Sequence, residues 1–203
     1  DYYDPNQGYS LPNDYGRLVQ LYIGGNGNQA LSPGFFQPVV VDPGNVGASR
    51  YQDAIEGCVT TPITPGMVLQ PEPGRMVGPT THGFENLIAL DPAARWDPAA
   101  NNGMGGPVGG CMAAGTCSRS PRWVAVPVFD IDQYEQARLA QNPAAGRNLQ
   151  ITVVKIIGVW IDEVRNANND IRGYITHYPT VNMTGNAPNG NTGAFARTVI
   201  LVR

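Results

Sequence analysis

Apolar residues recur along this chain in short alternating runs, and residues that favour turns separate the runs. Such alternation is typical of β-strands. The longest run, LQITVVKIIGVWI at 149–161, is apolar on both alternating faces, as expected of a central strand covered on both sides. Prolines and a glycine interrupt two of the other runs and indicate edges or bulges there. The segments we interpret as strands are 17–23, 34–41, 63–69, 123–129, 149–161, 171–178 and 194–202.

Helical periodicity is confined to short segments. Ser49 and Gln52 have the spacing of a capping box and predict a helix that ends at Gly57. A further short helix is expected over 131–140.

The segment PGRMVGPTTHGFENLIALDP at 73–92 predicts another helix. Pro79 suits a first helical position, and Phe84, Leu87 and Ile88 fall on one face. This face should pack against the sheet. His82 lies near the polar start of the helix, where we expect a solvated or hydrogen-bonding role rather than catalysis.

These patterns predict a single mostly β domain, a β-rich α+β fold over residues 17–203. We expect a central antiparallel or mixed sheet, two or three short helices and long loops rich in Gly, Asn and Pro. The composition agrees, because 25 Gly and 18 Pro indicate many turns and 42% hydrophobic residues suffice for a core. Residues 97–120 are expected to form a long Gly/Ala/Asn-rich loop.

Residues 1–16, DYYDPNQGYSLPNDYG, are predicted to be an extended N-terminal arm. The arm lacks apolar periodicity and cannot hold itself folded. It therefore packs either on its own domain or on a neighbouring copy, in which case it would mediate self-assembly. The aromatic residues available for either contact are Tyr2, Tyr3, Tyr9 and Tyr15.

Charge excludes two classes of partner. The formal net charge is -3 and only 14% of residues are charged, so no cluster of basic residues is present to neutralise a nucleic-acid backbone. Lys155 is the only lysine, which argues against a polybasic membrane-binding patch. The chain also contains no run of eighteen apolar residues that would cross a bilayer.

Lys155 is itself unusual, because its neighbours on one strand face are Val153 and Ile157. A lysine crossing apolar surface needs an ion pair or a head group that reaches solvent, and we expect one of these. The alternative is an isopeptide bond to an Asn or Asp, which would lower the intact mass by one ammonia or one water.

The three cysteines, Cys58, Cys111 and Cys117, are best interpreted as disulfide candidates. Cys111 with Cys117 would close a small loop, whereas Cys58 with either would join distant segments. Sequence alone does not choose between these pairings. A zinc site is disfavoured, because His82 and His177 lie far from the cysteines and from each other.

No pattern for a cofactor or a catalytic residue emerges. There is no Gly-x-Ser-x-Gly elbow and no phosphate-binding glycine motif. The carboxylates of Asp130, Asp132 and Glu135 are weak candidates for Ca²⁺, but they do not match a calcium loop. We interpret them as helix-capping and solvated groups, so we predict no catalytic residues, no bound metal and no cofactor.

Several sequence blocks resemble bacterial TadE/TadG-like proteins, which take part in the assembly of Flp (tight adherence) pili. The specific blocks are the PG-x-M-VGPT…LIA-x-DP segment at 73–92 and SPRWVAVPVFD at 120–130. The remaining blocks are YGRLVQL (15–21), SPGFFQPVVVD (32–42), YQDAIEGC (51–58) and ILVR (200–203). The resemblance thus covers nearly all of residues 15–203.

The resemblance implies a bacterial, exported domain outside the cytoplasm, at the cell surface or beyond it. Such proteins carry an N-terminal membrane anchor, which this chain lacks, so membrane attachment would come only through that missing segment. We therefore expect a non-enzymatic structural or interaction protein whose partners are other copies of itself or other pilus and cell-envelope proteins. Through its arm it would self-assemble into an extracellular filament.

The alternative function is a secreted carbohydrate-binding module or glycoside hydrolase. Trp96 would supply an aromatic contact, and Asp91 and Asp97 would supply a pair of carboxylates. Spacing in the sequence does not say whether these two carboxylates meet in space.

Overall fold

A computed structural model describes most of the chain. The described residues are 14–23, 35–41, 46–57, 61–72, 76–130, 133, 134, 136, 150–165, 170–177 and 199–202. Tyr2, Tyr3, Tyr9, Cys58, Asp132 and Glu135 lie outside them, as does most of the helix expected over 131–140. Within the described residues, no helix is long and apolar enough to span a bilayer.

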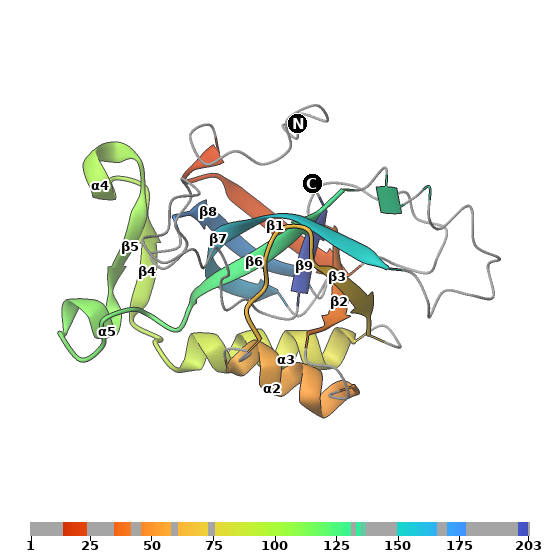
Figure 1. The fold of residues 1–203 in the computed structure, drawn as a ribbon. Coiled ribbons are helices and arrows are strands. Elements are labelled where there is room, and N and C mark those ends of the chain that lie inside the picture. The colour runs from red at the N-terminus through yellow and green to blue at the C-terminus, as the bar shows by residue number, and fades with distance from the viewer. Residues whose placement is uncertain are drawn as a thin grey trace.

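In the part of the chain that the structure describes, the main sheet has seven strands: β1 (Leu18–Ile23), β2 (Phe35–Val40), β3 (Val68–Pro71), β6 (Trp123–Phe129), β7 (Ile151–Arg165), β8 (Asp170–Thr176) and β9 (Val199–Val202). Six of these strands form a closed ring. Around the ring the order is β1–β8–β7–β6–β9–β2 and back to β1, every neighbour being paired. The seventh strand, β3, pairs with both β2 and β7. We call this closed sheet the barrel (Figure 1).

Most pairings in the barrel are antiparallel, and two are parallel. The parallel pairs are β1 with β2 and β6 with β9. The predicted β-rich α+β class is therefore confirmed, and the sheet is of the mixed kind. The strand interpretations hold where the structure describes them, whereas residues 34, 149, 178 and 194–198 of the predicted strands lie outside the described residues. The segment 63–69 enters the main sheet only at Val68, because Pro65 and Gly66 precede it in a turn.

Two helices, α2 (Ala48–Glu56) and α3 (Val77–Ala89), pack against each other along one side of the barrel (Figure 1). Tyr51 and Ile55 of α2 and Phe84 and Leu87 of α3 are buried in a core that they share with β1, β6, β7 and β8. The predicted apolar face of α3 is confirmed, because Ile88 also packs against this core. A second core lies among β2, β3, β6 and β7.

Strand β7 contributes to both cores, as its sequence predicted. The adjacent residues Ile156 and Ile157 belong to different cores: Ile157, with Val159, lies in the first, whereas Ile156, with Val153, lies in the second. A strand that feeds two cores needs apolar residues on both faces, which explains its lack of simple alternation.

The expected capping box at Ser49 is wrong. The N-cap of helix α2 is Gly47, two residues before Ser49, with φ 110°, and the helix begins at Ala48. The Gly47 N–H donates instead to the Glu72 carboxylate, 3.2 Å away, at the end of β3. The Glu72 side chain, distant in sequence, therefore binds the start of α2, a role that had been predicted for the nearby Ser49 and Gln52. The predicted end at Gly57 is confirmed.

The start of α3 also differs from the prediction. The helix begins at Val77, so Pro79 is its third residue rather than its first. Met76 precedes the helix in the left-handed region at φ 47°. The Thr80 hydroxyl lies 2.6 Å from the Met76 carbonyl oxygen and 3.0 Å from the Tyr51 hydroxyl, so it links the start of α3 to α2.

The long loop expected over 97–120 is wrong. This stretch belongs to a separate two-stranded sheet formed by β4 (Ala94–Asp97) and β5 (Gly106–Gly109). Two short helices, α4 (Ala100–Gly103) and α5 (Gly110–Ala113), complete it. We call residues 91–122 the side hairpin, which stands beside the barrel in Figure 1.

Candidate functional site

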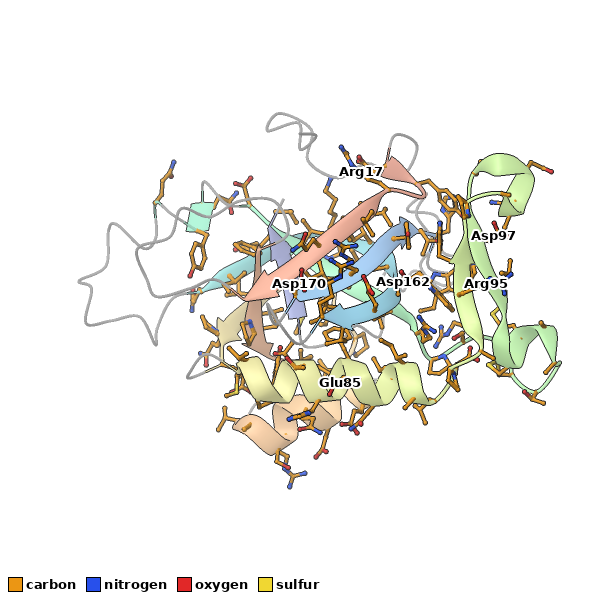
Figure 2. All side chains as sticks on the ribbon, turned by 180° about the vertical axis from the view of Figure 1, so that it is seen from behind. Arg17, Glu85, Arg95, Asp97, Asp162 and Asp170 are labelled. Carbon is orange, nitrogen blue, oxygen red and sulfur yellow. A yellow bond between two sulfur atoms is a disulfide. The ribbon has the colours of Figure 1, made fainter. Side chains whose placement is uncertain are left out.

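Side chains from distant parts of the chain meet where the side hairpin joins the barrel. One group is polar and centres on Arg122, and the other is aromatic and centres on Trp96. We call the whole region the junction. Figure 2 views it from behind, with Asp162 on the barrel side and Arg95 and Asp97 on the hairpin.

Arg122 holds the polar half of the junction together. Its side chain is buried, with 3% of its surface exposed. Nε donates to the Ile161 carbonyl at 2.9 Å, and Nη2 donates to the Asp162 carbonyl at 2.5 Å. Nη1 donates to the carbonyls of Ala94, at 2.5 Å, and Asp91, at 3.3 Å. One guanidinium therefore links β7 of the barrel to the side hairpin.

Burial and nearby charge act on Arg122 in opposite directions. Burial lowers its pKa, and the carboxylates of Asp162 and Asp91 oppose this effect. The ring of Trp160 lies 5.1 Å from the guanidinium carbon and adds a cation–π contact. The group remains a cation, because an arginine pKa starts far above neutral pH.

Asp91 organises the return of the side hairpin. It is 3% exposed, and its carboxylate accepts the Cys111 N–H at 2.9 Å and the Ser120 hydroxyl at 2.5 Å. The turn has no room for a side chain at Gly110, where a β-carbon would lie 2.2 Å from Asp91 Oδ1.

A disulfide between Cys111 and Cys117 closes the turn that follows β5. This is one of the pairings that the sequence left open. The bond fixes α5 next to Asp91, because the Cys111 amide hydrogen is the one that Asp91 accepts. Cys58, the third candidate, lies outside the described residues.

The edge of β4 that faces the barrel is satisfied by side chains instead of a neighbouring strand. Arg122 donates to the Ala94 carbonyl, and the backbone N–H of Trp96 donates to the Asp162 carboxylate. Burial raises the pKa of Asp162, and the positive charge of Arg122 counteracts this effect. An unpaired strand edge would otherwise be a site for aggregation.

The aromatic half of the junction encloses Trp96. Its ring stacks on Tyr174 of β8, with centroids 4.5 Å apart and planes 7° apart. Gly105 approaches so closely that a β-carbon there would lie 2.8 Å from Trp96 Cζ2. Tyr15 lies 6.5 Å from Trp96 and 5.1 Å from the ring of His177.

Tyr15 is the described member of the four tyrosines predicted for the N-terminal arm. It is half-buried and packs against the first core of its own chain. The Asn101 amide donates to its hydroxyl at 3.4 Å. At Tyr15, therefore, the arm packs on its own domain.

The geometry gives the residues of the predicted alternative enzyme site other roles. Asp91 is buried and bound to Cys111 and Ser120, whereas Asp97 accepts the Ala99 N–H at 2.9 Å. Trp96 has one ring face on Tyr174 and lies against Gly105. A sugar-binding platform needs an open ring face, and this ring is used to attach the hairpin.

The remaining candidates lie away from the junction. Lys155 is half-buried in β7, opposite Val128, and an isopeptide bond there stays a prediction. Asp130 accepts the Gln133 N–H at 3.4 Å, which agrees with a capping role. His82 is exposed and pairs with Glu85 at 3.2 Å. Among the described residues, no group of three His, Cys, Asp or Glu is placed to bind a metal.

Sequence reasoning missed Arg122, Ser120 and Asp162 as site residues. The only sequence signal for Ser120 and Arg122 was that the triplet SPR at 120–122 belongs to a block that resembles TadE/TadG-like proteins. No local pattern pointed to these residues. In the structure the two most specific blocks of that resemblance meet. The first block contains Asp91, near its end, and the second opens with Ser120 and Arg122.

Comparison with known protein families, with curated proteins and with solved structures finds no match for this chain.

Proposed function

We propose that this chain is an exported, non-enzymatic structural or interaction domain of a TadE/TadG-like pilus-assembly or cell-surface system. The observation that carries this proposal is the junction. The two sequence blocks most specific to the resemblance are distant along the chain, yet Asp91 of one contacts Ser120 and Arg122 of the other. These blocks fix a side hairpin in place, which is a structural role.

The disulfide supports a location outside the cytoplasm. Disulfides persist in oxidising compartments and are rare in a reducing cytosol. The Cys111–Cys117 bond is part of the junction, because the bonded Cys111 donates its amide hydrogen to buried Asp91. An exported protein would form this bond after leaving the cytoplasm.

The positions of the carboxylates argue against the glycoside hydrolase. Hydrolysis of a glycosidic bond needs two carboxyl groups that reach the same bond. Asp91 is 3% exposed, and both of its carboxylate oxygens face groups of the side hairpin. Its hydrogen bonds suit the support of a turn and leave no path to a substrate.

Self-assembly through residues 1–16 is part of the proposal. Tyr15 already contacts the barrel side of the junction through His177, so an arm leaving this point starts beside the side hairpin. Electron microscopy of the purified chain, with and without residues 1–13, tests the arm. Filaments that vanish with the deletion would support it, and single particles in both samples would contradict it.

The cellular role is tested in the bacterium that encodes the chain. We expect deletion of the gene to reduce the number of surface pili counted by electron microscopy. Protease added to intact cells should digest an epitope-tagged copy. Normal pilus numbers in the deletion strain, or a tagged protein that is protected in intact cells, would contradict the proposal.

A further inference from the structure

The disulfide of the side hairpin can be reached from solvent. Cys111 and Cys117 are six residues apart, and both are half-buried. Residues 112–116, which lie between them and include part of α5, are all exposed. Access to the sulfur atoms is a requirement for exchange between a disulfide and an external thiol.

The turn between the two cysteines is held by hydrogen bonds that do not involve the disulfide. The Cys111 carbonyl accepts the backbone N–H groups of Thr116 at 2.9 Å and Cys117 at 3.3 Å, and the Thr116 hydroxyl at 3.2 Å. The Ala114 N–H donates to the Gly110 carbonyl at 3.1 Å. These bonds keep the turn in shape when the disulfide opens. The two sulfur atoms therefore stay close enough for the bond to form again.

The Asp91 carboxylate lies against one of the two sulfur atoms. Its Oδ2 is 3.4 Å from Cys111 Sγ, and Asp91 is only 3% exposed. A sulfur in a disulfide has no hydrogen to donate, whereas the thiol of a reduced cysteine does. Reduction therefore adds a donor to a buried carboxylate whose Oδ2 already accepts the Ser120 hydroxyl. Because this hydrogen bond exists only in the reduced chain, it favours opening of the disulfide.

We propose that Cys111–Cys117 is a site of thiol–disulfide exchange with a dithiol, and not only a structural crosslink. One thiolate of the dithiol attacks one of the bonded sulfurs, and the other cysteine leaves and takes up a proton. The second thiolate of the dithiol then attacks its own sulfur in the mixed disulfide, and the second cysteine leaves and is protonated. Two electrons and two protons pass to the cysteines, and the dithiol becomes a disulfide.

Asp91 makes the two cysteines unequal after reduction. It contacts Cys111 through both the backbone N–H and Sγ, and no such contact joins it to Cys117 among the described residues. A thiolate at Cys111 would be repelled by the carboxylate, so Cys111 is held as the thiol. Cys117 is then the reactive cysteine of the reduced chain. The inference requires a dithiol in the same compartment, but it does not depend on the assignment to pili.

Reduction of the folded wild-type chain by dithiothreitol tests the proposal. Without denaturant, we expect millimolar dithiothreitol to open the disulfide while the amide hydrogens of β6 and β7 stay protected from exchange. Removal of the reductant should restore the same pair. Peptide mass spectrometry after brief treatment with iodoacetamide reports each cysteine separately. Cys117 of the reduced chain should be alkylated about tenfold faster than Cys111.

Asp91→Asn tests the role of the carboxylate. Asparagine keeps an oxygen that can accept the Cys111 N–H, but it removes the charge beside Sγ. The equilibrium constant for forming the disulfide, measured in mixtures of reduced and oxidised dithiothreitol, should rise by about five- to tenfold. The difference between the two alkylation rates should shrink.

Asp97→Asn is the matched control, because Asp97 lies on the same hairpin and accepts the Ala99 N–H instead. It should leave the equilibrium constant within about twofold of wild type. Equal effects of the two substitutions would contradict the role of Asp91.

Two results on the wild-type chain alone would overturn the proposal, even if Asp91→Asn does not fold. One is a disulfide that is reduced only when β6 and β7 lose their protection, since the bond would then be a structural crosslink. The other is equal alkylation of Cys111 and Cys117 in the reduced, folded chain. Pilus counts and surface exposure do not enter these measurements, so their failure is distinct from failure of the proposed cellular role.

Discussion

Arg122 shows how one side chain can join segments that the sequence keeps apart. Its donors satisfy the carbonyls of Asp91, Ala94, Ile161 and Asp162. Arg122→Met would leave these buried acceptors without their donor and the Asp91 carboxylate without its nearby cation. We predict a loss of about 3–5 kcal/mol in the free energy of unfolding, measured by urea denaturation.

Arg95→Met is the control for this change. Arg95 lies on β4 with its side chain exposed, so its removal should cost within about 0.5 kcal/mol. Equal stability of the Arg122→Met and Arg95→Met proteins would show that Arg122 does not hold the junction.

Gly105 offers a second test at a single position. Gly105 and Gly103 share the same backbone angle, φ +84°, but only Gly105 lies against the Trp96 ring. Alanine should cost about 1 kcal/mol of backbone strain at either site. At Gly105 it should cost about 1–3 kcal/mol more, because its β-carbon displaces Trp96.

Thermal or urea unfolding compares the two glycine variants, and near-ultraviolet circular dichroism reports on the Trp96–Tyr174 stack. We expect the spectrum to change in Gly105→Ala and to stay unchanged in Gly103→Ala. If both variants lose the same stability, the close approach of Gly105 to the ring has no energetic role.

The site could be anticipated from the sequence only in part. The pair Cys111 and Cys117 was one of the open pairings, because the two cysteines lie close along the chain. Arg122 could not be found this way. Its partners are main-chain carbonyls far along the chain. Every residue type has a main-chain carbonyl, so the sequence does not show which residues will accept these hydrogen bonds.

At the scale of elements, α2 depends on a carboxylate from elsewhere in the fold. Glu72 is 4% exposed and accepts the Gly47 N–H at the start of the helix. Burial raises its pKa above the ordinary value of 4.5, and the hydrogen bond from Gly47 only partly counteracts this effect. The folded state therefore binds the Glu72 proton more tightly than the unfolded state does.

This difference predicts a pH dependence. The contribution of Glu72 to stability is fully present below pH 4.5 and is lost as the pH rises through the raised, folded-state pKa. Glu72→Gln keeps an acceptor for Gly47 and removes the ionisation. In urea unfolding from pH 4 to pH 7, wild type should therefore lose stability relative to Glu72→Gln, until the difference levels off. A difference that is constant with pH, or that changes the other way, would contradict this assignment.

Elements with strong periodicity were predictable, and those held by tertiary contacts were not. Strand β6 has the bounds predicted from its sequence, 123–129, and α3 buries the predicted face. Strands β4 and β5 have four residues each and are joined through a segment rich in Gly and Asn. Their order comes from Arg122, Asp162 and the Trp96–Tyr174 stack, none of which local patterns reveal.

For the whole molecule, seven strands were predicted and the described part of the main sheet has seven, but their closure into a ring was not foreseen. Closure depends on the parallel pairs β1–β2 and β6–β9, and β6 and β9 are far apart along the chain. Alternation predicts that a strand has a buried face, but it does not name the neighbouring strand. The same limit explains why the side hairpin was expected to be a loop.

The contacts of the junction fix the side hairpin to the barrel. The proposed function depends on this claim. Residue-resolved hydrogen exchange of the wild-type chain tests it most directly. The amide hydrogens of Trp96 and Cys111 are bound by Asp162 and Asp91, so we predict that both exchange orders of magnitude more slowly than in an unstructured peptide. Exchange of both at the rate of an unstructured peptide, while amides of β6 and β7 stay protected, would show that the side hairpin is not fixed to the barrel.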